Sequence, residues 1–151
     1  MALAQEIPLP EIIQCHHLSK EYGNEHVLAP QNLHVHTGEC LAVLGPSGSG
    51  KSTLLHILAL IDKASAGHYT LFSEPTEQLS AQQRHQLRAK NFGYIFQHYA
   101  LIPHLSVIEN ILLPLEYLHM PKPSHHLDEL LEILGLRSLK NRLPHSLSGG
   151  Q

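Results

Sequence analysis

The sequence predicts an α/β protein in which an antiparallel β part precedes an α/β core and a helical part follows it. Three observations lead to this prediction. The apolar run Cys40–Leu44 is too short for a helix and has the character of a strand buried on both faces. A glycine-rich loop follows it and leads into the apolar stretch Leu54–Ile61, which we predict to be helical. Beyond Gln97, helical patterns dominate the sequence.

The β part is predicted from short alternating segments and turn residues. Ile12 and Ile13 begin one strand, and Leu33–His36 alternates before a turn at Thr37 and Gly38, which together predict a hairpin leading into the buried strand. Two further strands are expected at residues 68–72 and 92–96, the second of them aromatic and ending at Gln97.

Helix starts are marked by a serine with Gln or Glu three residues later, because each side chain caps the other's backbone N–H group. Ser80 with Gln83 predicts a polar helix, and Ser106 with Glu109 predicts a second helix. A third helix is predicted from leucines on one face, with Gly135 where a left-handed C-cap belongs. The leucines that we expect to pack within the helical part are Leu127, Leu130, Leu131 and Leu134.

Composition limits the classes of protein to be considered. A chain of 151 residues holds one domain at most. Its net charge of -3 provides no basic field for a nucleic acid or an anionic bilayer, so we expect no nucleic-acid partner. Its longest apolar run is shorter than the roughly 20 residues of a spanning helix, and no secretory signal is recognisable. Two cysteines without CxxC spacing suit the reducing cytoplasm.

The glycine-rich loop matches the phosphate-binding pattern G-x-x-x-x-G-K-S/T, between a predicted strand and a predicted helix as that pattern requires. Its glycines lack the Cβ atoms that would keep backbone N–H groups from phosphate oxygens, and the helix N-terminus adds donors. Lys51 is expected to reach the β- and γ-phosphates of a nucleotide, and the Ser52 hydroxyl to coordinate Mg²⁺. The predicted binding residues are Gly45, Pro46, Ser47, Gly48, Ser49, Gly50, Lys51, Ser52 and Thr53.

A second motif lies at the end of the chain, where the last five residues are Leu147, Ser148, Gly149, Gly150 and Gln151. This pentapeptide downstream of a phosphate loop resembles the signature of the ATP-binding cassette (ABC) ATPases, and the resemblance runs over about residues 12–151. It implies a P-loop NTPase-type nucleotide-binding domain, with ATP and Mg²⁺ as cofactors. It also implies that the signature residues bind ATP held by the partner subunit of a head-to-tail homodimer.

Two further site residues follow from the resemblance. Residues 18–23 look like the family's A-loop, whose aromatic ring stacks on adenine, which gives that role to Tyr22. The other interpretation of Tyr22 is a surface aromatic in a turn before Gly23. Gln97 is similar to the Q-loop glutamine, which contacts Mg²⁺ and the attacking water, so it is the catalytic candidate and, with Ser52, a metal contact.

The resemblance also divides the chain. The nucleotide-binding core is expected over about residues 1–96, and the Q-loop, helical subdomain and signature over about 97–151. The family's Walker B acids, D-loop and switch histidine follow the signature in intact relatives and have no counterpart here. We therefore expect a C-terminally truncated chain that is inactive alone, and we assign no catalytic base. Mg²⁺-dependent ATP turnover by the purified 151-residue chain would contradict this expectation.

The function implied by the resemblance is that of the ATP-binding subunit of an ABC-type membrane exporter. The segments 79–88, 92–105 and 144–148 most resemble the macrolide-export and lipoprotein-release branch. Such a subunit is peripheral on the cytoplasmic face of the membrane and binds an integral membrane transporter subunit. The alternatives are a soluble ABC-type ATPase of repair or translation, against which the lack of large insertions argues, and a nonfunctional gene remnant. Co-purification with a membrane protein would separate the first two.

Fourteen histidines raise the hypothesis of a metal site. His34 and His36 would share one strand face, and the pairs His16-His17 and His125-His126 are adjacent in sequence. No third and fourth ligands follow at a spacing typical of zinc sites. We therefore interpret these residues as surface histidines.

Overall fold

The computed structural model describes residues 9–97, 99–118, 120–121 and 124–151, with the backbone alone for residues 124–125. The chain forms two compact units, of which the first ends at Phe92 and the second runs from Gly93 to Gln151. None of the described helices is both long and apolar enough to span a bilayer.

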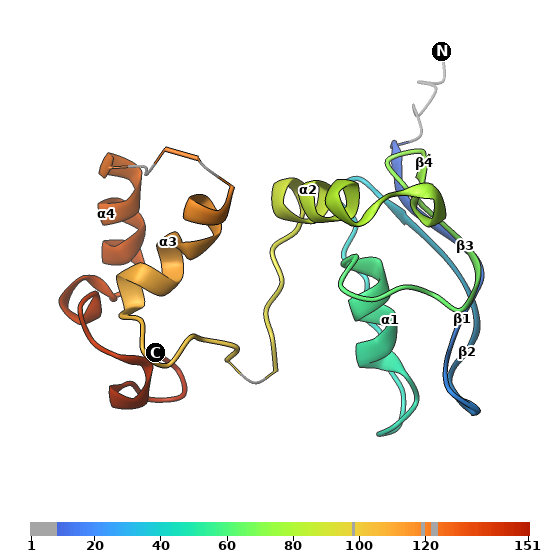
Figure 1. Ribbon diagram of the computed structural model, residues 1–151, viewed down its shortest axis with the longest axis horizontal. Coiled ribbons are helices and arrows are strands. Elements are labelled where there is room, and N and C mark those ends of the chain that lie inside the picture. Colours follow the sequence, from blue (N-terminus) through green and yellow to red (C-terminus); the bar gives the residue numbers. More distant parts are fainter. Residues whose placement is uncertain (1–8, 98, 119, 122–123) are drawn as a thin grey trace, which may run out of the picture. The chain divides into compact units, whose positions relative to one another are not determined.

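A four-stranded antiparallel sheet with the order β2-β1-β3-β4 belongs to the first unit (Figure 1). The predicted hairpin is formed by β1 (Glu11–Tyr22) and β2 (Glu25–His36), which are longer than the sequence indicated. The strand β3 (Ala66–Leu71) pairs with the other side of β1, and the short β4 (Glu74–Pro75) pairs with β3. A 3-10 turn η1 (Thr76–Gln78) follows.

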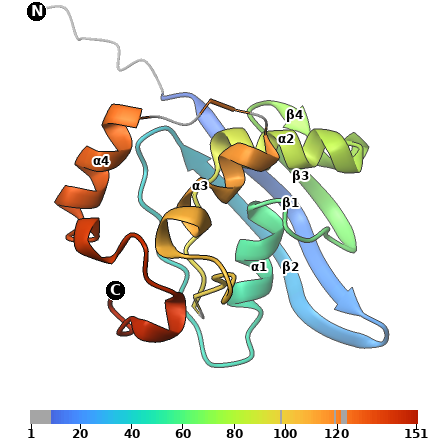
Figure 2. The ribbon, with the colours of Figure 1, turned by 60° about the vertical axis from the view of Figure 1, so that its left-hand side comes forward.

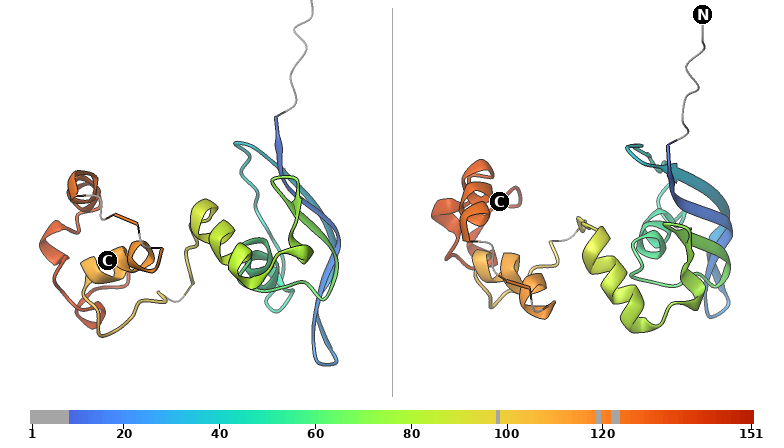
Figure 3. Two further views of the ribbon diagram at one scale, coloured as in Figure 1. Left: turned by 45° about the horizontal axis from the view of Figure 1, so that its top comes forward. Right: turned by 90° about the horizontal axis from the view of Figure 1, so that it is seen from above.

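The helix α1 (Lys51–Leu58) lies against one face of this sheet, as Figures 2 and 3 show. Its buried residues fall at helical spacing and join side chains of β1 and β3 in one core. The hydroxyl of Tyr69 donates to the Leu58 carbonyl oxygen at 2.7 Å, which satisfies a polar atom within this core. The core residues are Cys15, Leu18, Leu28, Leu54, Ile57, Leu58, Leu60, Tyr69 and Leu71.

The helix α2 (Ala81–Asn91) closes the first unit and begins as the sequence predicts. The Gln83 N–H donates to the Ser80 hydroxyl at 3.2 Å, and the Ser80 N–H donates to the Gln83 side chain at 2.9 Å. The capping box is therefore confirmed. The Arg88 guanidinium donates to the Leu60 carbonyl oxygen at 3.0 Å, which ties the helix to the loop after α1.

Two predicted strands are wrong. Residues 40–44 and 92–96 are irregular in the structure, and no other described strand pairs with either of them. A buried strand needs a neighbour for its backbone N–H and C=O groups, and the described part of the chain supplies none here. Leu44 is accordingly 89% exposed and Ile95 97% exposed. The helix predicted for Leu54–Ile61 also ends early, because Leu60 adopts a left-handed conformation with φ 58°.

The second unit is helical, and its predicted caps are confirmed. In α3 (Val107–Tyr117), the Ser106 N–H donates to the Glu109 carboxylate at 2.7 Å, and the Glu109 N–H donates back to the Ser106 hydroxyl. The helix α4 (Ser124–Ile133) is followed by Gly135, whose φ is 66°. The N–H groups of Gly135 and Leu136 bond the last carbonyls of α4 at 3.0 and 2.7 Å, the pattern of a glycine C-cap.

The leucine face of α4 is only partly buried, which corrects the sequence prediction. Leu131 is 1% exposed, but Leu130 and Leu134 are 40% and 65% exposed. The cause is that α4 packs mainly against the short turn η2 (Arg137–Leu139), which covers little of the helix. A last turn, η3 (Pro144–Ser146), leads to the end of the described chain.

Candidate nucleotide-binding site

The predicted phosphate loop lies directly before α1, in the first unit. Gly48 and Gly50 have φ of 80° and 84°, a backbone conformation that side chains with a Cβ rarely adopt. Gly50 also passes close to β2, because a Cβ at this position would lie 2.4 Å from the Val27 carbonyl oxygen. The glycine at position 50 is therefore required both by its dihedral angle and by its neighbour.

Lys51 is folded back over the loop. Its ammonium donates to the carbonyl oxygens of Gly45 at 3.0 Å and Pro46 at 2.5 Å, and it lies 3.4 Å from the Ser49 hydroxyl. These contacts hold the ammonium against the backbone of the loop. The arrangement places a cation at the loop that leads into α1.

The N-terminus of α1 differs from those of α2 and α3 because no side chain caps it. The first N–H of the helix with an internal partner is that of Leu54, which donates to the Gly50 carbonyl oxygen at 2.8 Å. The N–H groups of Lys51, Ser52 and Thr53 have no partner among the described residues. Together with the helix dipole, these groups form an anion site of the kind that binds phosphate.

Tyr22 lies at the end of β1 in a cluster that the sequence did not indicate. Its hydroxyl donates to the Asp62 carboxylate at 2.5 Å, and the Lys20 ammonium lies 4.7 Å from the centre of its ring. Lys20 in turn donates to Asp62 at 2.8 Å and to the Lys63 carbonyl oxygen at 2.6 Å. Lys20 and Tyr22 stand two residues apart on a strand, so their shared face was predictable, but nothing in the sequence points to Asp62.

The contacts within this cluster shift the pKa values of Asp62 and Tyr22. Partial burial alone would raise the pKa of Asp62, but hydrogen bonds from Lys20, Tyr22 and the Lys63 backbone outweigh it and lower that pKa to about 2. The pKa of Tyr22 is raised, first by its hydrogen bond to Asp62. At neutral pH Asp62 is therefore a carboxylate and Tyr22 a protonated phenol.

Acid is expected to weaken the fold through Asp62. Its folded pKa of about 2 lies below its ordinary value of 3.8, so its stabilising effect is complete well above pH 3.8 and disappears as the pH falls towards 2. Because the side chain is 29% exposed, we expect a loss of at most about 2 kcal/mol. Urea unfolding in steps of about one pH unit, from about pH 6 to about pH 2, measures this loss of the free energy of unfolding. Asp62→Asn should flatten its pH dependence, and Asp128→Asn serves as the exposed control. An unchanged slope in Asp62→Asn would contradict the assignment.

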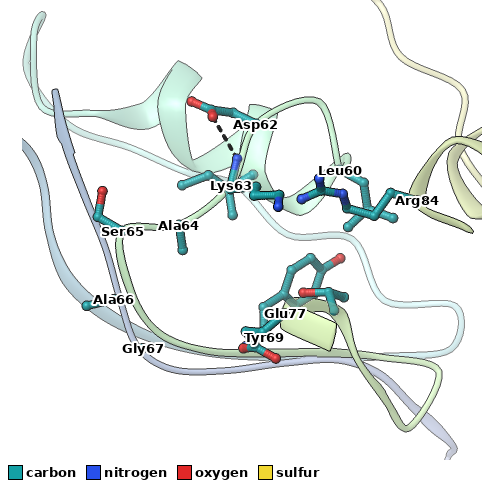
Figure 4. A pocket seen from close by; sticks show the side chains of 12 residues that line it. Leu60, Asp62, Lys63, Ala64, Ser65, Ala66, Gly67, Tyr69, Glu77 and Arg84 are labelled. Atoms are coloured by element: carbon teal, nitrogen blue, oxygen red, sulfur yellow. Dashed lines mark hydrogen bonds between the residues drawn. The ribbon is translucent and has the colours of Figure 1, made fainter. Parts of the chain in front are cut away.

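A pocket of about 230 Å³ lies beside this cluster, between the loop after α1 and the segment that leads into α2. In Figure 4, Lys63 and Arg84 point towards one another on one side of it, with Tyr69 and Glu77 on the other. The phosphate loop does not line this pocket. The unpaired backbone donors and Lys51 are at the loop and not at this pocket.

Gln97 and the signature lie in the second unit. Gln97 is exposed in a bend. At the signature, the Ser148 N–H donates to the Gln151 side chain at 2.9 Å, and the Gln151 N–H donates to the Ser148 carbonyl oxygen at 3.0 Å. The second bond closes a turn, and the first is one of the two bonds that the Ser-x-x-Gln spacing forms at Ser80 and Gln83. A Cβ at Gly149 would lie 2.7 Å from the Tyr99 hydroxyl, so this glycine is closely packed.

Two of the histidines considered as metal ligands contact carboxylates. His34 pairs with Glu11, and the His36 ring lies 3.4 Å from Glu39. Among the residues that the structure describes, no group of three or more His, Cys, Asp or Glu side chains has an arrangement suited to a metal ion. The side chain of His125 lies outside the described residues.

The glycine loop, its lysine and the uncapped helix define the class of P-loop nucleotide-binding proteins. The sequence model described as ABC transporter matches residues 28–151, and the chain therefore belongs to the ABC transporter family. This confirms the family and the fold class predicted from the sequence. ATP is the nucleotide of this family.

Two curated relatives show the extent of the match. The chain is 42% identical over 127 residues to the macrolide export ATP-binding/permease protein MacB of Burkholderia lata, covering 83% of this chain and 18% of that protein. It is 41% identical over 151 residues to the ABC transporter ATP-binding protein YbbA of Escherichia coli K12, covering 96% of this chain and 66% of YbbA. The chain thus spans less than a fifth of MacB and about two thirds of YbbA.

The structure is similar to a solved ATPase of the same family. It superposes with a TM-score of 0.80 on the dimeric, post-hydrolysis ATP-binding cassette MJ0796 bound to ADP and Pi. The two chains are 32% identical, and the match covers 93% of this chain and 65% of MJ0796. The fold of the described residues is therefore that of an ABC cassette.

Proposed function

We propose that the chain is the ATP-binding part of an ABC-type membrane exporter. The observation that carries this proposal is the phosphate loop, where the Lys51 ammonium contacts the loop and the first N–H groups of α1 are unpaired. Family membership and the similarity to MacB support a role in export. The Ser52 hydroxyl and Gln97 would hold Mg²⁺, and Gln97 would also contact the attacking water.

The remaining parts of the site have proposed roles in binding and assembly. The Tyr22 ring would stack on adenine. The signature, from Leu147 to Gln151, would bind the γ-phosphate of ATP held by a second ATPase subunit, so that ATP stabilises a homodimer. An integral membrane transporter subunit would respond to this ATP-driven dimerisation. The ATPase would be peripheral on the cytoplasmic face of the membrane. The nucleotide-binding core over residues 1–96 would supply the loop, and residues 97–151 the contacts to the partners.

Mg²⁺-dependent binding of ATP tests the proposal. We expect the purified chain to bind ATP, and Mg²⁺ to tighten this binding by about 10-fold, because the ion screens the phosphates and is held by the Ser52 hydroxyl. Isothermal titration calorimetry with ATP, in Mg²⁺ and in EDTA, measures the effect. Ser52→Ala should lose the response to Mg²⁺, whereas Ser138→Ala in the second unit should keep it. A folded chain that binds no ATP would refute the proposal.

A further inference from the structure

The helix α1 links the two parts of the proposed nucleotide site, the phosphate-binding loop and the Tyr22 ring. Its N-terminus presents the phosphate-binding donors, and the loop after its C-terminus carries Asp62, whose carboxylate accepts the Tyr22 hydroxyl at 2.5 Å. We propose that Asp62 is a positioning residue that holds the Tyr22 ring in place for the base of the nucleotide. This inference rests on the proposed function, in which Tyr22 stacks on adenine.

The position of Asp62 is itself fixed by the backbone. The N–H groups of Ile61 and Asp62 both donate to the His56 carbonyl oxygen, at 2.8 and 3.1 Å, and so close the end of the helix. The Asp62 carboxylate accepts the Lys63 N–H at 2.7 Å in the same turn. These bonds fix the backbone and one carboxylate oxygen of Asp62, and its second oxygen accepts the Tyr22 hydroxyl.

Lys20 completes the anchor. Its side chain is only 10% exposed, and its ammonium donates to Asp62 at 2.8 Å and to the Lys63 carbonyl oxygen at 2.6 Å. The same ammonium lies 4.7 Å from the centre of the Tyr22 ring, while half of the Tyr22 surface remains exposed. The ring is thus held by its hydroxyl and by a cation–π contact, and its exposed surface is available to a ligand.

An anchored ring should bind a base more tightly than a free one. A surface tyrosine loses rotamer freedom when a ligand stacks on it, and this loss weakens binding. The hydrogen bond to Asp62 fixes the ring before the ligand arrives. The gain depends on the base, so it should appear with ATP and not with a ligand that consists of phosphates alone.

The test compares ATP with inorganic tripolyphosphate, by calorimetry on the full chain in Mg²⁺. Tyr22→Phe keeps the aromatic ring and removes only the hydroxyl, and we expect it to weaken ATP binding by about five-fold and to leave tripolyphosphate binding unchanged. Asp62→Ala should weaken ATP binding by a similar factor, and the double variant should be no weaker than either single one, because both remove the same bond.

Two variants separate positioning from a general structural effect. Asp62→Asn retains an acceptor for the Tyr22 hydroxyl and should recover most of the ATP affinity, even if Asp62→Ala folds poorly. Tyr117→Phe, an exposed tyrosine of the second unit, should bind both ligands like the parent chain. Equal ATP affinity in Tyr22→Phe and the parent would overturn the inference, and so would a parallel loss of ATP and tripolyphosphate binding.

A titration of the free protein distinguishes this inference from the proposed function. The pKa of the Tyr22 phenol is raised in the parent chain, and Asp62→Asn should lower it towards its ordinary value, as followed by NMR of tyrosine labelled with ¹³C. A parent chain that binds neither ligand refutes the proposed function. A phenol pKa that Asp62→Asn leaves unchanged refutes the anchor, whatever the chain binds.

Discussion

Replacing Lys51 with alanine is expected to lower the affinity for ATP by at least about 100-fold, because the phosphates then lose two or more charge-assisted hydrogen bonds. In the structure, this ammonium donates to loop carbonyl oxygens at 2.5 and 3.0 Å, so it lies at the loop that would hold the phosphates. Calorimetry with ATP in Mg²⁺ measures the loss.

Two controls make the Lys51 result specific. Lys90→Ala removes an exposed cation from the last turn of α2 and should leave ATP affinity unchanged. Lys51→Arg keeps the positive charge, but its planar guanidinium is too wide for contacts made by a compact ammonium, and we expect it to restore little of the affinity. If the affinity of Lys51→Ala for ATP were within about 3-fold of that of the parent chain, the loop would not be the phosphate site.

Local sequence signals predicted much of the fold because they act within a few residues. The capping pairs at Ser80 and Ser106 and the glycine end of α4 are confirmed, since each depends on one side chain and a nearby backbone group. The hairpin is confirmed for a related reason, because its two strands are neighbours in sequence. Of the site, the phosphate loop was predictable from its pattern of glycines and Lys51.

The failures concern contacts between distant segments. The apolar run at residues 40–44 has the composition of a buried strand, but composition does not state which strand will pair with it. In the described chain it remains unpaired, and Leu41 and Leu44 are exposed. Asp62 was missed for a similar reason: its partner Tyr22 lies 40 residues away. Pairings at such a distance depend on the whole fold, which sequence patterns do not contain.

Gly50 is the second site residue whose substitution should have a large effect, here on the free energy of unfolding. Both the packing of the fold and the shape of the phosphate loop depend on it. Gly50→Ala should lower the free energy of unfolding by more than about 3 kcal/mol, since it combines a left-handed φ of 84° with a Cβ only 2.4 Å from the Val27 carbonyl oxygen. Neither the backbone of β2 nor the start of α1 can move without disturbing the core around Leu28 and Leu54.

Gly48→Ala provides the matched control for Gly50. Its φ of 80° is nearly the same, but nothing lies within 4 Å of a Cβ at this position, so it should lose only the about 1–2 kcal/mol of the strained dihedral. Urea unfolding followed by circular dichroism compares the two variants. A larger loss in Gly50→Ala than in Gly48→Ala isolates the contact with β2, and equal losses would mean that the loop does not rest on this strand. Because that contact holds the loop in front of α1, Gly50→Ala should also weaken ATP binding more than Gly48→Ala does.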